Sequence, residues 1–146
     1  MKQKIIIWIL ALLLIDQLAT AIGIRPARTN LAVDDYDENN IKIDGKFWVV
    51  NNDHREFTVD VYVDGEMGEF VKLKTDDKKL TFRPEDDAKE VEFEIKFKKE
   101  EVPPGTAIAN IVIEERFENS QANVVSSKLI LKHKINFVGP YPDLYI

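Results

Sequence analysis

The segment Val91-Glu92-Phe93-Glu94-Ile95-Lys96-Phe97-Lys98 alternates strictly between apolar and charged side chains. Successive side chains of an extended strand point to opposite faces, so this pattern predicts a β-strand with one buried and one solvated face. Residues 57–64 repeat the alternation, with apolar side chains at every odd position. Residues 41–49 form a third set, in which the odd positions are predicted to face inward and Trp48 lies on the opposite face.

Further strands are predicted on both sides of these three. The shorter candidates are residues 69–74 and 79–83, and the longer ones are residues 107–117 and 128–138. Clusters of Asn, Asp, Pro, Gly and Ser separate them, as turns require, and no helical stretch is evident after residue 21. Strands at this spacing predict an all-β fold, an immunoglobulin-like antiparallel β-sandwich of seven to eight strands over residues 22–140. The chain has no Cys, so it is not a true immunoglobulin domain with the usual Cys…Trp…Cys pattern.

The N-terminus predicts the compartment. Two lysines precede an apolar run of eleven residues, which Asp16 ends, and Ala19-Thr20-Ala21 then supplies a small-x-small cleavage site. These features are typical of a secretory signal peptide, residues 1–21. The run is shorter than the about 20 residues that span a bilayer, and Asp16 disfavours the alternative of an uncleaved anchor. We expect the mature chain to start at Ile22, to have no membrane span, and to work in the periplasm or at the cell surface.

Composition excludes several classes of function. The 146 residues carry a net charge of −6, which argues against nucleic-acid binding, because phosphates require a basic surface. Without Cys there is no disulfide, thiol nucleophile or Cys-based zinc site. Three serines, Ser120, Ser126 and Ser127, lack the sequence context of a catalytic nucleophile. We therefore expect a protein that is not an enzyme and that has no cofactor.

Several stretches, in order and spacing, carry a resemblance to a known group of proteins. They are Ile24-Arg25-Pro26-Ala27-Arg28-Thr29, residues 80–91, Val102-Pro103-Pro104-Gly105-Thr106 leading into residues 111–115, and residues 133–138. Together they resemble the N-terminal sandwich domain of periplasmic pilus chaperones. They are also similar to related secreted domains of the major-sperm-protein type. The resemblance covers residues 22–140 and implies the same sandwich fold.

In that chaperone family, two basic residues anchor the carboxylate of an incoming pilin, one on the first strand and one on the last. The resemblance implies that Arg28 is the first. Lys134 matches the second, and Lys132 or His133 would take that place after a slip of one or two residues. The family also has a second domain. We expect residues 141–146, which look like the start of another extended segment, to begin a following segment or domain that is truncated here, rather than to dock on the sandwich.

The last predicted strand has two different faces. His133 shares its parity with apolar residues, which predicts a core or edge histidine with satisfied hydrogen bonds rather than a ligand or a switch. The opposite parity is mostly basic. The apolar set comprises Leu129, Leu131, Ile135 and Phe137, and the other set comprises Lys128, Ile130, Lys132, Lys134 and Asn136.

Two further candidate sites come from the residues alone. Asp35, Asp37 and Asn39 have the alternating oxygen spacing that opens a calcium-binding loop, but Lys46 stands where a closing Glu would be required. A solvated loop is the simpler interpretation. Trp48, with Val50, predicts an exposed apolar patch of the kind that marks partner surfaces, unless a loop or the C-terminal segment covers it.

These observations favour a non-catalytic interaction or structural module of the cell envelope, which binds another envelope or surface protein through a strand edge. Arg28, Lys134 and Trp48 are the candidate contact residues. The first alternative is a pilus-type assembly chaperone that anchors a subunit carboxylate. The second alternative is a calcium-dependent adhesion domain. The sequence leaves the identity of the partner and the oligomeric state open.

Overall fold

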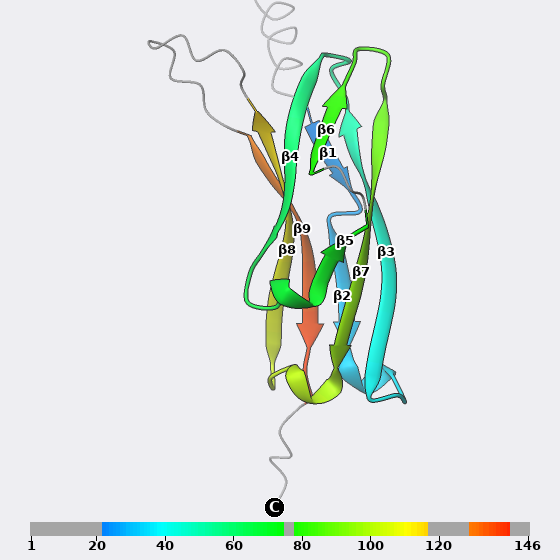
Figure 1. The fold of residues 1–146 in the computed structure, drawn as a ribbon, viewed down its shortest axis with the longest axis vertical. Helices are drawn as coiled ribbons and strands as arrows, with labels where there is room; N and C mark the ends of the chain where they lie inside the picture. The colour runs from blue at the N-terminus through cyan, green and yellow to red at the C-terminus, as the bar shows by residue number, and fades with distance from the viewer. Residues whose placement is uncertain (1–21, 75–77, 117–128, 141–146) are drawn as a thin grey trace, which may run out of the picture.

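The structure is a computed structural model, and it describes residues 22–74, 78–116 and 129–140. The described residues form nine strands and three single turns of 3-10 helix (Figure 1). The strands are β1 (Ile22–Arg25), β2 (Arg28–Ala32), β3 (Asn40–Asn51), β4 (Phe57–Asp64), β5 (Val71–Leu73), β6 (Lys79–Phe82), β7 (Ala88–Lys98), β8 (Thr106–Arg116) and β9 (Ile130–Val138). The turns of helix are η2 (Val33–Asp35), η3 (Gly68–Phe70) and η4 (Lys99–Glu101).

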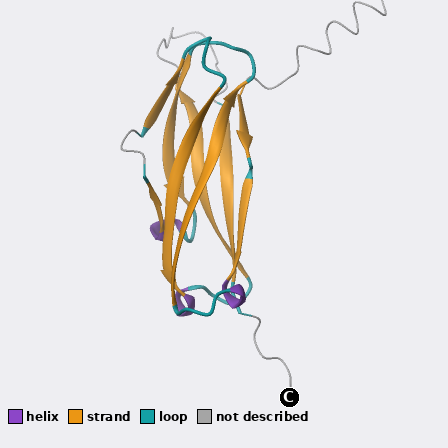
Figure 2. Ribbon diagram, turned by 90° about the vertical axis from the view of Figure 1, so that its right-hand side faces the viewer, coloured by secondary structure: helices purple, strands orange, loops and turns teal. Residues whose placement is uncertain are grey.

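The strands lie in two sheets that pack face to face. Figure 1 looks along their edges, with β4, β8 and β9 on the left and β3 and β7 on the right, and Figure 2 looks onto one sheet with the other behind it. One sheet has the order β1-β3-β7-β5 and the other has the order β2-β9-β8-β4-β6. This confirms the predicted all-β sandwich. The strands outnumber the predicted seven to eight because the first extended segment is divided between the sheets. Its second half, β2, pairs with β9 in parallel, whereas the other pairs are antiparallel.

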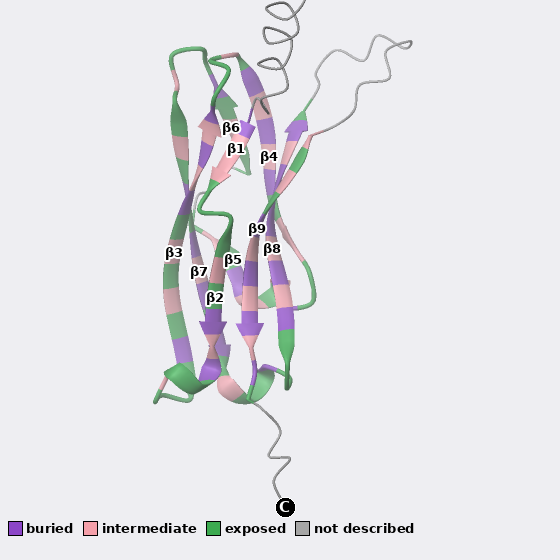
Figure 3. Ribbon diagram, turned by 180° about the vertical axis from the view of Figure 1, so that it is seen from behind, coloured by how far each residue is buried: buried purple, intermediate pink, exposed green. Residues whose placement is uncertain are grey.

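The apolar parities of the long strands form the core between the sheets, and Figure 3 shows buried residues alternating with more exposed ones along these strands. On β7, Val91, Phe93, Ile95 and Phe97 are buried, as the alternation predicted. Gly45, on the inward face of β3, lies opposite Phe93 in the register, and the Phe93 ring occupies the space that a side chain at Gly45 would need. The predicted strand over residues 69–74 is shorter than expected, because η3 takes its first two residues.

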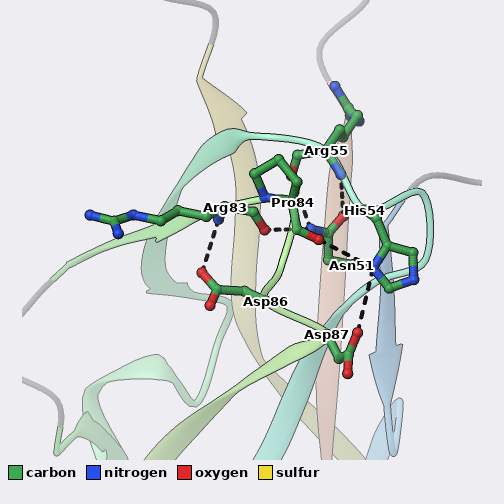
Figure 4. Close-up of polar contacts among 7 residues, drawn as sticks. All are labelled: Asn51, His54, Arg55, Arg83, Pro84, Asp86 and Asp87. Atoms are coloured by element: carbon green, nitrogen blue, oxygen red, sulfur yellow. Dashed lines mark hydrogen bonds and ion pairs between the residues drawn. The ribbon is translucent and has the colours of Figure 1, made fainter.

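Two loops at one end of the sandwich are tied together through Asn51, the last residue of β3 (Figure 4). Its buried side-chain amide donates to the carbonyl oxygens of Arg55 and Arg83 at 2.9 and 3.3 Å, and its carboxamide oxygen accepts from the Arg55 N–H. The main-chain N–H of Asn51 donates to the Asp87 carbonyl. The β3–β4 loop and the β6–β7 loop are therefore held by one side chain.

Two predictions fall outside the described residues, the signal peptide over residues 1–21 and the segment over residues 141–146. Within the described part of the chain, no helix is long and apolar enough to cross a membrane.

Candidate functional site

The first extended segment changes sheets at residues 26–27. β1 pairs with the end of β3, from Ile22 opposite Asn51 to Arg25 opposite Trp48. Pro26 then interrupts the strand, since proline has no N–H to donate to a ladder, and β2 begins alongside β9 in the other sheet. β1 lies above this crossing and β2 below it (Figure 3). The change of sheet therefore leaves the upper half of β9 without the neighbour that its lower half has.

Arg28 is the first residue of β2, and its register partner on β9 is Lys134. The main-chain N–H of Lys134 donates to the carbonyl of Ala27 at 2.9 Å, which fixes the register at this point. Thr29 and Ile135, the next pair, turn inward, so Arg28 and Lys134 lie on the outer face of the five-stranded sheet. We call these two residues the anchor pair. Among the described residues, neither has a carboxylate within ion-pair distance.

The anchor pair continues into a polar row across the same sheet. Lys134 is opposite Asn110 on β8, and Asn110 is opposite Asp64 on β4. The Asn110 amide donates to the Asp64 carboxylate at 3.0 Å, so the nearest acidic group of the row is already bonded and lies three strands away from Arg28. The positive charge of the anchor pair is therefore available to an anion from outside.

His133 lies directly beneath the anchor pair, on the inner face of β9. Its exposed fraction is 0%. The ring stacks on Phe47, with the centroids 4.6 Å apart and an interplanar angle of 3°, and it meets Phe93 at 5.5 Å. Its two nitrogens contact the crossing segment and β2: Nδ1 is 2.8 Å from the Pro26 carbonyl and Nε2 is 2.8 Å from the Thr29 hydroxyl. Burial lowers the pKa of His133, although the hydrogen bond to Pro26 opposes this.

The upper half of β9 forms a free strand edge. Its register with β2 begins only at Lys134, and alternate residues of a strand direct their main-chain groups to the same side. Because the Lys134 N–H points to the β2 side, the main-chain groups of Ile130 and Lys132 point to that side as well, where β1 passes nearby but no described strand pairs with them. We call residues 130–132 the free β9 edge. Ile130 is 48% exposed, an unusual feature for a large aliphatic side chain in this fold.

β3 has a second open edge on the same side, below the pairing with β1, but its exposed charges are neutralised locally. Lys42 forms an ion pair with Glu94 at 3.5 Å, and Asp44 forms one with Lys74 at 2.8 Å. The hydrogen bond from Lys74 lowers the pKa of Asp44. Lys132 also places a charge beside the free β9 edge, but that edge ends at the anchor pair, whereas these two pairs on β3 are already neutralised. The free β9 edge is therefore the better candidate for a binding edge.

Trp48 does not join the anchor pair. It lies on the outer face of the four-stranded sheet, between Arg25 on β1 and Glu90 on β7, and it is half-buried. The Lys46 ammonium lies 5.4 Å from the centre of its ring. Trp48 therefore belongs to a different surface from Arg28 and Lys134.

The candidate calcium residues lie at the lower end of the sandwich. Asp35 ends η2, and Asp37 and Asn39 follow in the loop before β3. The Lys99 ammonium donates to the carbonyl of Tyr36, between the two aspartates, and so places a cation in the loop. Among the described residues, no group of three or more His, Cys, Asp or Glu side chains is arranged to hold a metal ion.

Both Arg28 and Lys134 were expected from the sequence as candidate contact residues, whereas their surroundings were not. The register places Lys134, rather than Lys132 or His133, opposite Arg28. The free β9 edge and the contact of Thr29 with His133 were not predicted. The one available signal was Pro26, whose missing N–H marks an interruption of the first strand.

Comparisons with known proteins agree with this architecture. No family model matches the chain, and no curated protein matches it. Among solved structures, the E. coli chaperone DraB is similar at 11% identity and a TM-score of 0.52, covering 82% of this chain and 55% of DraB. A chain of the Salmonella enterica SafA pilin–SafB chaperone complex matches at 10% identity and a TM-score of 0.52, covering 81% and 54%. WR4, a C. elegans major sperm protein family member, has 9% identity and a TM-score of 0.47, covering 83% and 99%.

The likeness to the two chaperone structures confirms, at the level of fold, the resemblance to pilus chaperones. This chain spans just over half the length of the two chaperone structures. At these identities the likeness concerns the fold alone.

Proposed function

We propose that this protein is a non-catalytic, extracytoplasmic binding module that captures an extended segment of another envelope or surface protein. The segment adds a strand at the free β9 edge, and the anchor pair holds a carboxylate at the end of that segment. The observation that carries the proposal is the position of the free edge, which ends where Arg28 and Lys134 lie side by side.

The main chain and the side chains have separate parts in this binding mode. The outward-pointing N–H and C=O groups of Ile130 and Lys132 supply ladder hydrogen bonds, which do not depend on the sequence of the partner. The exposed side chain of Ile130 offers apolar contact. Arg28 can hold a carboxylate through two parallel hydrogen bonds, and Lys134 adds a second positive charge.

The charge of the anchor pair also selects the direction of the partner strand. β9 runs from the free edge toward Lys134, in the same direction as β2. A partner strand parallel to β9 brings its C-terminal carboxylate to the anchor pair, whereas an antiparallel strand brings its N-terminal ammonium there. The first arrangement is attractive and the second is repulsive, so we expect a parallel strand that ends near Ala27.

Assembly chaperone activity on a surface filament is the more specific form of this proposal. It is favoured by the fold shared with DraB and with the SafA–SafB complex, together with two adjacent cations at the end of a free strand edge. In that case the captured segment is part of a filament subunit.

The test is capture of a partner from envelope extracts of the host by the wild type and by single variants. We expect Arg28→Ala and Lys134→Ala each to weaken capture by about 1.5–3 kcal/mol, the range for a charge-assisted hydrogen bond. Lys132→Pro removes an N–H that points to the free side and should also weaken capture. Lys132→Ala removes the same charge but keeps the N–H, so the difference between the two variants measures the effect of the N–H. Arg83→Ala changes an exposed arginine of the β6–β7 loop, outside the anchor pair, and is the matched control. Equal recovery of the same partner by all of these proteins would overturn the proposal.

A further inference from the structure

We propose that neutral His133 holds β2 against β9 and thereby aligns Arg28 with Lys134, so that acidification through the range in which histidines titrate detaches β2 and disperses the anchor pair. This inference concerns regulation of the site described above, and its consequence for binding rests on the proposed function. The movement of β2 itself does not.

The hydrogen bonds assign the tautomer of His133. A carbonyl oxygen only accepts, so Nδ1, which is 2.8 Å from the Pro26 carbonyl, carries the proton of the neutral ring. Nε2 is then an acceptor, and the Thr29 hydroxyl donates to it at 2.8 Å. One neutral ring thus satisfies a group in the crossing segment and a group in β2, and both contacts fix where β2 begins.

Protonation would place a positive charge in a site that offers it no counter-ion. The ring faces Phe47 on β3, Phe93 on β7, Ile111 on β8 and Thr29 on β2, none of which is charged. The charged residues nearest to it on β9 and β2 are Lys132, Lys134 and Arg28, which are all cations and lie on the opposite face.

The nearest inward-facing carboxylate on β8 is Glu115. It lies four residues beyond Ile111, roughly 13 Å along a strand, and it already accepts a hydrogen bond from Arg55. Stacking on Phe47 offsets part of the free-energy cost of placing a positive charge on the buried ring. Burial nevertheless dominates, as the lowered pKa of His133 shows.

Detachment of β2 is the movement that exposes the buried His133 ring to water at the lowest free-energy cost. β3, β7 and β8 each pair with strands on both sides, whereas β2 is a five-residue edge strand with a single neighbour, β9. Short edge elements with few buried contacts open at lower free energy than central strands. When β2 detaches, Thr29 leaves the ring, Arg28 leaves Lys134, and the free edge of β9 lengthens toward Val138.

The direction of the pH effect follows from the two pKa values of the histidine. With β2 attached, the pKa of His133 lies below the ordinary value, and with β2 detached and the ring hydrated it returns toward about 6.5. The detached state therefore binds the proton more tightly. The contribution of neutral His133 to the attachment of β2 is therefore fully present above about pH 6.5. It is lost as the pH falls through the lower pKa of the attached state.

The experiment is amide hydrogen exchange followed by NMR between pH 7.5 and pH 5, reported as protection factors so that intrinsic exchange rates cancel. We expect the protection factor of the Lys134 N–H, which bonds Ala27 across to β2, to fall by about tenfold or more in this range. Amides in the β4–β8 pairing, such as Ile113, should keep theirs. A Lys134 protection factor that does not change with pH in the wild type would overturn the proposal.

The two histidines of the chain give a matched pair of variants. His133→Gln keeps a donor and an acceptor but does not titrate, so it should hold β2 in place at both pH values. His54→Asn alters the exposed histidine, whose positive φ an asparagine tolerates, and should behave as the wild type. An equal loss of protection in His133→Gln and in the wild type would also overturn the proposal.

If His133→Gln does not fold, Thr29→Val serves instead, and we expect it to lower the protection of Lys134 already at pH 7.5. Unchanged protection in Thr29→Val would again contradict the proposal.

A second measurement links this movement to binding. Capture of the partner should weaken from pH 7.5 to pH 5 for the wild type and for His54→Asn, and it should stay constant for His133→Gln. The exchange experiment needs no partner, so it decides the movement of β2 even if the anchor pair captures nothing. Conversely, capture that depends on Arg28 but not on pH in the wild type would support the proposed function and remove this regulation.

Discussion

Arg28 and Lys134 are 106 residues apart in the sequence and are direct register partners on β2 and β9. Two cations side by side on paired strands repel each other, as like charges across a sheet do. Among the described residues, neither is paired with a carboxylate. The arrangement therefore costs stability in the free protein, and a bound anion would relieve that cost.

The first prediction tests this cost. Arg28→Gln should raise the melting temperature slightly at low ionic strength, because it removes the repulsion with Lys134. The gain should disappear at about 1 M salt, where the Debye length is about 3 Å. Thermal unfolding monitored by circular dichroism measures both, with Arg83→Gln as the control. A lower melting temperature for Arg28→Gln at low salt would show that Arg28 makes a stabilising contact instead.

The second prediction concerns the side chain that joins the two upper loops. Asn51→Ala should lower the free energy of unfolding by about 1–3 kcal/mol, because it leaves the partly buried carbonyl oxygens of Arg55 and Arg83 without their donor. Urea denaturation measures the loss. Asn52→Ala, at the exposed neighbouring position, should be close to neutral. An equal loss of unfolding free energy in Asn51→Ala and Asn52→Ala would show that the hydrogen bonds of Asn51 do not hold the two loops together.

The third prediction compares two Arg–carboxylate pairs. Glu115 is only 5% exposed, and Arg55 donates to its carboxylate at 2.8 Å. Arg55→Met should cost about 1–3 kcal/mol, less than the 3–5 kcal/mol of a fully buried pair, because the guanidinium is partly exposed. Arg116→Met breaks the more exposed pair with Asp60 and should cost less than about 1 kcal/mol. The same denaturation assay ranks the two, and a reversed order would refute the argument from burial.

The fourth prediction concerns the contact of Phe93 with Gly45. Gly45→Ala places a methyl group in the space that the Phe93 ring occupies, and it should destabilise the protein by about 1–3 kcal/mol. Because Phe93 also contacts His133, the NMR signals of the His133 ring should shift. Gly23→Ala is the matched control, since a methyl group there meets its nearest neighbour, Asn52 Nδ2, at an ordinary 3.5 Å. An unchanged free energy of unfolding in Gly45→Ala would mean that Phe93 can move aside.

The fifth prediction concerns calcium. The cation of Lys99 bonds the carbonyl of Tyr36 within the acidic loop, so the loop that contains Asp35 and Asp37 should not need a metal ion to fold. Adding a chelator to the purified protein should leave its melting temperature unchanged. A decrease of several degrees would mean that calcium stabilises the folded state by linkage, and the adhesion alternative would then gain support.

The period-two pattern of the sequence determined the fold class and the inward faces. It predicted that Val91, Phe93 and Ile95 would be buried, and it placed His133 on the apolar parity of its strand, as a core or edge histidine. These predictions succeed because side-chain alternation is a local property of an extended backbone, and apolar faces must be buried wherever the partner strands lie. Arg28 and Lys134 were identified as candidates through the resemblance of short stretches to pilus chaperones, not through the alternation.

Only the tertiary structure decided how the strands pair. The parallel pairing of β2 with β9 and the contact of His133 with Thr29 join segments about 100 residues apart, and the change of sheet at Pro26 depends on that pairing. A register is set by the packing of both sheets together, and a shift of one residue would turn every side chain to the other face. Glu115 shows the same limit, because nothing in its own strand indicates that Arg55 would meet it inside the sandwich. Local periodicity determines which face of a strand is buried, whereas the neighbour of each residue depends on the whole fold.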